Sequence, residues 1–365
     1  MKKQLAAKAG RMRLRVLGAS ALMLLLAACG DHPPKDDDDD KPAPPAAITI
    51  VAGDATASGS ADGTGSAARF NGPGGIAIDA AGNLYVADTG NHTIRKITSA
   101  GVVTTLAGSA GSSGTVNATG SAARFSNPVA LAIGPGNVLY VGDKRLVRRV
   151  GTAGQVSTVA EIRLGSNVDG RSEVLADIAG IAVDARDDLI VANGHSVRRI
   201  TANGALTMLQ GEETLRDTFG TRTFVQRGVA TDSSNNVYVE NAGTINRTNA
   251  ANIVTQNVLT LLAGTAGQRG SADGAGAAAR FEDVVALTVD PQGNVYAADN
   301  INNLIRKITP AGVVSTVAGK LKATTLGAGA LPGSFPNLRG RTTDGKGNFY
   351  ATSGNAIVKI ALPSR

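Results

Sequence analysis

Six oxygen-bearing side chains recur at one position of a repeated pattern, and these are the residues best placed to do chemistry. They are Asp88, Asp143, Asn193, Asn241, Asp299 and Ser353. If they converged, a ring of oxygens could hold a cation such as Ca²⁺, or the hydroxyls of a sugar. Alternatively, each side chain caps the turn that follows it, because short polar side chains accept hydrogen bonds from backbone N–H groups in turns.

Two histidines, His92 and His195, follow in corresponding turns of two copies of the pattern. A zinc site needs several converging His, Cys or carboxylate ligands. Two separated histidines do not supply them, so we expect no metal ligand or catalytic residue here. The predicted ligand face consists of these two histidines with Asp88, Asp143 and Asp299.

Each of these polar residues ends a short apolar strand whose central position is nearly always tyrosine. All five tyrosines of the chain occupy this position, and Ile190 replaces them in the remaining copy: Tyr85, Tyr140, Tyr238, Tyr296 and Tyr350. One whole copy, 75–108, reads as four short strands joined by tight turns. Strands that are apolar on both faces must be covered on both sides, so each copy needs neighbours of its own kind.

The period and the strand signature resemble the NHL-repeat family, six-bladed β-propellers named for an Asn-His-Leu triplet. That triplet is present in degenerate form as Asn91-His92-Thr93 and Asn302-Asn303-Leu304. The resemblance covers residues 47–365 and implies an all-β fold, a six-bladed β-propeller of four-stranded antiparallel blades. It implies little about function, because such scaffolds carry many unrelated activities.

The two ends of the repeated region predict how the ring closes. Residues 47–53 match the fourth strands of other copies, although no first three strands precede them. The last copy stops after its third strand, 356–362. We therefore expect the N-terminal strand to complete the C-terminal blade, which removes the open edge.

The segment before the repeats reads as a leader and a tether. Residues 1–28 combine a basic start with an apolar run too short for a typical membrane span, which indicates a lipoprotein signal peptide. Cys29, the only cysteine, is the expected lipid acceptor. Residues 29–46 then form an acidic, proline-rich tether. These features favour lipid anchoring at a bacterial outer membrane, facing the periplasm or the cell surface.

The long connections between blades predict structural contacts. Four phenylalanines stand 15 residues before the tyrosine position, and we expect them to plug the spaces between blades: Phe70, Phe125, Phe281 and Phe335. Three arginines beside them, Arg69, Arg124 and Arg280, are expected to pair with nearby acids. Basic third strands such as 94–97 are expected to lay their stems along neighbouring blades with their heads in solvent.

The net charge and the sequence motifs exclude some classes of function. The formal net charge of +7 includes six basic residues of the leader, so the exported part is only mildly basic and nucleic acid is not expected as a partner. The glycine-rich 63–66 lacks the strand–helix context of a phosphate loop. We expect a monomeric binding scaffold for a protein or carbohydrate ligand, without a cofactor. The alternative is an enzyme resembling lactonases or streptogramin lyases, with a metal at the channel mouth.

Overall fold

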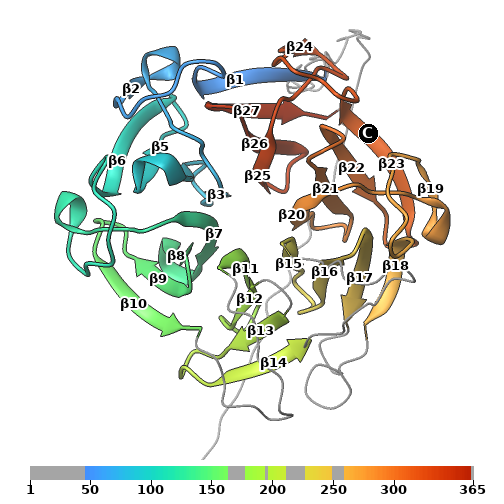
Figure 1. Ribbon diagram of the computed structural model, residues 1–365, viewed down its shortest axis with the longest axis horizontal. Coiled ribbons are helices and arrows are strands. Elements are labelled where there is room, and N and C mark those ends of the chain that lie inside the picture. Colours follow the sequence, from blue (N-terminus) through green and yellow to red (C-terminus); the bar gives the residue numbers. More distant parts are fainter. Residues whose placement is uncertain (1–45, 163–176, 194–195, 211–226, 249–258, 363–365) are drawn as a thin grey trace, which may run out of the picture. The chain divides into compact units, whose positions relative to one another are not determined.

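The computed structural model describes residues 46–162, 177–193, 196–210, 227–248 and 259–362. The predicted leader, Cys29, nearly all of the tether and His195 lie outside these ranges. The described residues form six antiparallel sheets arranged as blades around a central axis (Figure 1). None of their helices is long and apolar enough to span a membrane.

The first three blades each contain four main strands in sequential order. Blade 1 consists of β3 (Ile76–Ile78), β4 (Leu84–Asp88), β5 (Thr93–Ile97) and β6 (Val102–Gly108). Blade 2 consists of β7 (Pro128–Gly134), β8 (Val138–Asp143), β9 (Leu146–Val150) and β10 (Val156–Glu161). Blade 3 consists of β11 (Ile178–Val183), β12 (Leu189–Asn193), β13 (Ser196–Ile200) and β14 (Leu206–Gln210).

The other three blades repeat this plan. Blade 4 consists of β15 (Val229–Thr231), β16 (Val237–Asn241), β17 (Thr244–Thr248) and β18 (Thr260–Gly264). Blade 5 consists of β20 (Val284–Val289), β21 (Val295–Asp299), β22 (Leu304–Ile308) and β23 (Val313–Gly319). Blade 6 consists of β25 (Leu338–Thr343), β26 (Asn348–Ser353), β27 (Ala356–Ala361) and β1 (Ala47–Gly53).

The predicted closure of the ring is confirmed in blade 6. Strand β1 pairs antiparallel with β27, from Ala47 opposite Ala361 to Gly53 opposite Ala356. The first strand of the propeller therefore lies beside the last, as Figure 1 shows. Because β1 takes the place of a fourth strand, both ends of the repeated region are tied into one sheet.

Three blades differ from the prediction by carrying a fifth, two-residue strand at the outer edge. These strands are β2 (Gly63–Thr64), β19 (Gly274–Ala275) and β24 (Gly329–Ala330). They arise because the connection between blades folds back along the outermost strand, as Gly63 does opposite Val103. Short 3₁₀ turns complete the connections: η2 (Gly65–Ala67), η3 (Thr89–Asn91), η4 (Gly120–Ala122), η5 (Pro135–Asn137) and η6 (Gly276–Ala278).

The tyrosine position fixes the turn between the first and second strands. In blade 1 the Tyr85 hydroxyl donates to Asp79 Oδ2 at 3.1 Å, and Asn83 Nδ2 donates to the same oxygen at 2.8 Å. Tyr238 with Asp232 and Tyr296 with Asp290 repeat the contact. These three tyrosines are buried, and each keeps a hydrogen-bond partner for its hydroxyl.

The four phenylalanines are fully buried, which confirms the predicted plugs. Phe125, for example, belongs to one apolar cluster with Tyr85 and Ala107 of blade 1 and Val141 of blade 2. Near the axis the first strands approach so closely that a side chain does not fit everywhere. A Cβ on Gly180 would lie 2.2 Å from the carbonyl oxygen of Arg227. Small residues at these points allow neighbouring blades to surround a narrow channel.

Candidate ligand-binding site

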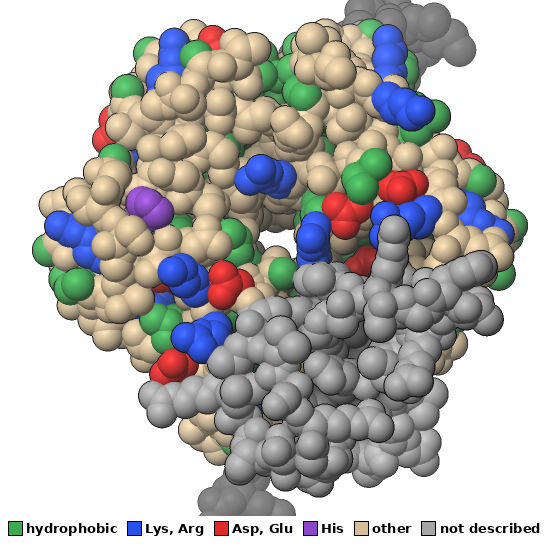
Figure 2. All heavy atoms as spheres, viewed as in Figure 1, with side chains coloured by type: hydrophobic (Ala, Val, Ile, Leu, Met, Phe, Trp, Pro, Cys, Tyr) green, Lys and Arg blue, Asp and Glu red, His purple; other side chains and the backbone are tan. Residues whose placement is uncertain are grey.

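A cavity of about 530 Å³ lies at the centre of the ring, where the first strands of all six blades meet. Figure 2 shows a hollow at this point, with Lys and Arg side chains beside its rim. The volume falls within the range of about 300–1,000 Å³ typical of small-molecule sites. A wall drawn from six blades lets a repeated frame present six different side chains to one ligand.

Six equivalent positions, one on each first strand, contribute to the wall of this cavity. The strand register identifies them, because each pairs with the residue that follows the tyrosine position. They are Ile76, Leu131, Ile181, Val229, Leu287 and Arg341, which we call the channel ring. All six are buried. Five are aliphatic, and the arginine of blade 6 breaks the symmetry.

Further polar groups lie on the cavity wall. Arg227 and Arg339 contribute guanidinium groups, and Asp177 contributes a carboxylate. The Nη1 atom of Arg227 lies 3.3 Å from a carboxylate oxygen of Asp283 in blade 5. Among the described wall residues, three arginines therefore accompany one carboxylate. This donor set does not suit a divalent cation, which prefers several carboxylate or carbonyl oxygens.

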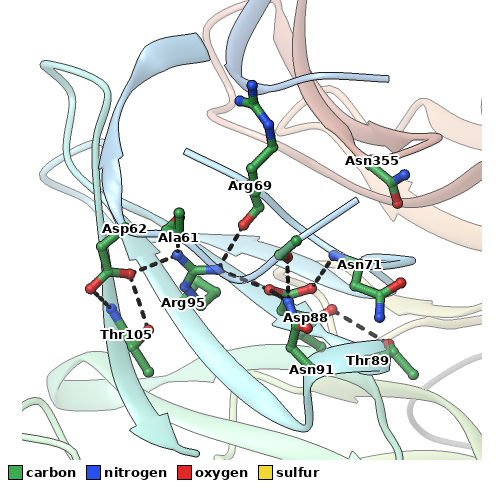
Figure 3. Close-up of polar contacts among 12 residues, drawn as sticks. Ala61, Asp62, Arg69, Asn71, Asp88, Thr89, Asn91, Arg95, Thr105 and Asn355 are labelled. Carbon is green, nitrogen blue, oxygen red and sulfur yellow. Dashed lines mark hydrogen bonds and ion pairs between the residues drawn. The ribbon is translucent and has the colours of Figure 1, made fainter. Parts of the chain in front are cut away.

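The predicted ligand-face residue Asp88 is instead the centre of a buried network within blade 1 (Figure 3). Its Oδ1 accepts from the backbone N–H of Asn71 at 2.8 Å. Its Oδ2 accepts from Asn91 Nδ2 at 2.7 Å and from Arg95 Nη1 at 2.9 Å. The other end of Arg95 pairs with Asp62 at 2.6 Å. The network, which we call the blade lock, ties the incoming connection to the second and third strands.

Blades 2 and 5 repeat the blade lock, although in blade 2 the far end of the arginine donates to Asn117 instead of an aspartate. Asp143 accepts from the backbone N–H groups of Ser126 and Asn127 and pairs with Arg148 at 3.2 Å. Asp299 accepts from the backbone N–H of Glu282 at 3.1 Å and pairs with Arg306 at 3.2 Å.

The three aspartates are fully buried, and the structure does not bring them together. Their burial raises the pKa of each carboxyl, while backbone hydrogen bonds and the paired arginine act in the opposite direction. Because their oxygens are already occupied, this geometry favours the capping interpretation. The ligand-face hypothesis for these residues stays a prediction without structural support.

The remaining predicted residues also have local partners. Asn193 accepts from the hydroxyl of Ser196 at 2.8 Å, and Ser353 donates to the carbonyl of Pro336 at 2.8 Å. His92 is half-buried with a left-handed backbone, and its Nδ1 lies 2.9 Å from the carbonyl oxygen of Ser126. His195 lies outside the described residues. Among the described residues, no group of three or more His, Cys, Asp or Glu could hold a metal ion.

Two expectations about the arginines are wrong. Arg69, predicted to pair with an acid, donates to the backbone carbonyls of Ser66 and Ala68, and Arg124 and Arg280 do the same in their own connections. The acids pair instead with third-strand arginines, whose heads were expected in solvent but are buried. The reason in blades 1, 2 and 5 is that the arginine head lies over a plug phenylalanine, as Arg95 does at 5.1 Å from the Phe70 ring centroid.

Arg341 was not predicted from the sequence. The predicted residues lie at strand ends and turns, whereas the cavity is walled mainly by first strands, together with Thr89 and Asn300, which directly follow Asp88 and Asp299. The sequence does carry a signal in the first strand of blade 6, where Arg341 stands at a position that is apolar in every other blade. Aligning that strand with the first strands of the other blades requires the strand pairing of the structure, because the residues around Arg341 do not resemble those of the other copies.

The comparisons with known proteins agree with this fold. The family model of the NHL repeat matches residues 70–97, which contain β4 and β5 of blade 1. The match to one NHL repeat and the six antiparallel sheets confirm the predicted repeat type and the six-bladed β-propeller fold. No curated protein matches the chain in sequence.

Solved structures with this architecture serve different functions. A protein of unknown function from Bacteroides thetaiotaomicron has a TM-score of 0.69 and 21% identity, covering 87% of this chain and 76% of its own. An auxiliary nutrient binding protein from the same organism has a TM-score of 0.65 and 16% identity, with the same coverage. Virginiamycin B lyase from Staphylococcus aureus has a TM-score of 0.51 and 12% identity, covering 79% and 80%. At these identities the similarity concerns the fold alone.

Proposed function

We propose that this protein is a binding propeller that holds a small molecule in its central channel and is tethered to a bacterial outer membrane by a lipid on Cys29. The observation that carries the binding proposal is the 530 Å³ cavity, whose wall combines an aliphatic ring with a few polar groups. Small-molecule sites typically have this composition. The similarity to a nutrient-binding propeller is consistent with such a role.

Filling the channel tests the binding proposal. Ile181, on the channel ring, is replaced by Phe, and the exposed Val313 on the outer strand of blade 5 is replaced by Phe as a matched control. Melting temperatures are then measured against a set of carboxylates, sugars and short peptides. Compounds that stabilise the wild type and Val313→Phe should no longer stabilise Ile181→Phe. If Ile181→Phe keeps every response, the binding surface lies elsewhere.

The anchoring proposal has its own test. Cys29→Ser should abolish incorporation of labelled fatty acid and release the protein from the membrane fraction. A Cys29→Ser protein that still fractionates with washed membranes would show that the lipid is not the anchor.

The enzyme alternative, a lactonase- or lyase-like propeller with a metal at the channel mouth, has weaker support. Three arginines and one carboxylate on the described wall do not form a donor set that fits a divalent metal. Metal analysis of the purified protein separates the alternatives, because one tightly held divalent ion per chain would favour the enzyme.

A further inference from the structure

Arg341 is buried to the same degree as its aliphatic counterparts on the channel ring. It is 5% exposed, against 3% for Ile76 and 8% for Leu131. One guanidinium nitrogen, Nη2, donates to the carbonyl oxygen of Ala286 in blade 5 at 2.8 Å. Within the part of the chain that the structure describes, Nε and Nη1 are buried without a hydrogen-bond partner. The side chain thus keeps a charge on the cavity wall with one neutral acceptor.

Four other buried arginines are compensated. Each of them pairs with at least one aspartate: Arg95, Arg148, Arg199 and Arg306. Arg341 has no carboxylate partner among the described residues, and its burial lowers its pKa well below the ordinary value. An uncompensated buried charge is strongly unfavourable, so such groups are normally paired or bound to a ligand.

The surroundings of Arg341 indicate which ligand would compensate it. The rest of the channel ring is aliphatic, so it can contact the apolar part of a small molecule. Beyond it, Arg339 is exposed and Arg227 is already paired with Asp283, while Asp177 is the one described wall carboxylate. The single guanidinium charge of Arg341 in an aliphatic ring would be neutralised by a single negative charge on the ligand. A doubly charged phosphate would leave excess charge against the aliphatic wall.

We propose that the channel binds a small monocarboxylate with an apolar body, whose carboxylate pairs with Arg341 while the aliphatic members of the channel ring contact the body. This inference rests on the proposed binding function and adds the chemical class of the ligand. The guanidinium of arginine suits this role, because it is planar and forms charge-assisted hydrogen bonds with carboxylates.

Calorimetry on the full-length protein in detergent tests this, with benzoate, its neutral counterpart benzamide, and phenyl phosphate as probes. We expect one benzoate per chain, bound at least about tenfold more tightly than benzamide or phenyl phosphate, a preference of about 1.4 kcal/mol. Arg341→Leu, which gives blade 6 the residue of blades 2 and 5, should abolish the preference. Arg341→Met is the second variant if Leu packs badly. The matched control is Arg149→Gln, which changes an exposed arginine of β9 that does not line the cavity and should keep the preference.

A second readout separates a ligand-binding role from a structural one. If Arg341 serves the ligand, Arg341→Leu or Arg341→Met melts at the same or a higher temperature than the unliganded wild type. If Arg341 only supports the blade 5–blade 6 contact, both melt lower and benzoate binding does not depend on charge.

Three results would overturn the inference. These are equal binding of benzoate and benzamide, tighter binding of phenyl phosphate, or no benzoate binding to the wild type. Equal binding that Ile181→Phe abolishes would leave the proposed channel function intact and remove only the assignment to Arg341.

Discussion

Arg306 in blade 5 and Arg341 in blade 6 are both buried arginines, but their surroundings differ completely. Arg306 pairs with Asp299 at 3.2 Å and Asp273 at 2.7 Å, donates to two backbone carbonyls and lies 5.1 Å from the Phe281 ring centroid. Arg341 has one backbone carbonyl. The buried arginine shared by several blades therefore belongs to the frame, whereas Arg341, present in a single blade, lies on the channel wall.

The blade lock shows why the frame keeps its polar residues. Each connection between blades brings backbone N–H groups into a buried place, where they need acceptors. The aspartate supplies these acceptors, and the arginine neutralises the aspartate. The near-identical connections of blades 1 and 5 are therefore explained by packing and hydrogen bonding, without a ligand.

Breaking one blade lock should have the largest effect. Asp143→Ala leaves Arg148 buried without its carboxylate, and we expect a loss of about 3–5 kcal/mol in the free energy of unfolding. Chemical denaturation measures it. The double variant Asp143→Leu with Arg148→Met should be less destabilised than Asp143→Ala, because it leaves no uncompensated charge. A single variant as stable as the wild type would contradict the frame interpretation.

Glu240 gives a smaller, pH-dependent effect. It is a second buried polar residue without a counterpart, since other blades have Ala, Gly or Thr at its position. Burial raises the pKa of Glu240 from 4.5 to about 8. Between these values the folded state holds more protons than the unfolded state, so the free energy of unfolding falls as pH rises.

The matched variant is Glu240→Gln, which cannot titrate. The wild type should lose a few kcal/mol relative to Glu240→Gln between about pH 4.5 and pH 8, since each pKa unit corresponds to about 1.4 kcal/mol. Denaturation curves at several pH values measure the difference. Parallel curves for the two proteins would show that Glu240 is ionised in the fold throughout this range.

The smallest effect is expected at His92. Its backbone is left-handed with φ of 59°, and Asn303 holds the equivalent turn of blade 5 with φ of 57°. Asn303 also donates to a carbonyl of the next connection, that of Ala323 at 2.9 Å. His92→Asn should therefore change stability by no more than about 0.5 kcal/mol, while His92→Val should cost more because β-branched residues disfavour this conformation. A thermal melt compares them, and a large loss in His92→Asn would indicate a specific role for the imidazole.

Much of the fold could be predicted because the sequence repeats the same strand pattern in six copies. The tyrosine position located every second strand, and the unmatched strand at residues 47–53 predicted the closure. The partners of the arginines could not be predicted in the same way. In blade 1, Arg69 of the connection and Arg95 of the third strand were both possible partners for the same acids. Only the path of the folded chain determines that Arg95 reaches Asp62, while Arg69 donates to backbone carbonyls.

The channel was missed for a related reason. The predicted aspartates end the second strands, where their side chains turn back to the chain's own connection rather than toward the axis. The axis is walled by first strands, which are the least alike among the six copies. Arg341 therefore stands out only after strand pairing has aligned it with Leu131 and Leu287.

Carboxylate binding at Arg341 is tested most directly by a crystal structure of the protein grown with 4-iodobenzoate, in which anomalous scattering locates the iodine. We expect an iodine peak inside the channel, against the aliphatic members of the channel ring, with the carboxylate on the guanidinium of Arg341. An iodine peak elsewhere with an empty channel, or a carboxylate directed away from Arg341, would contradict the proposal.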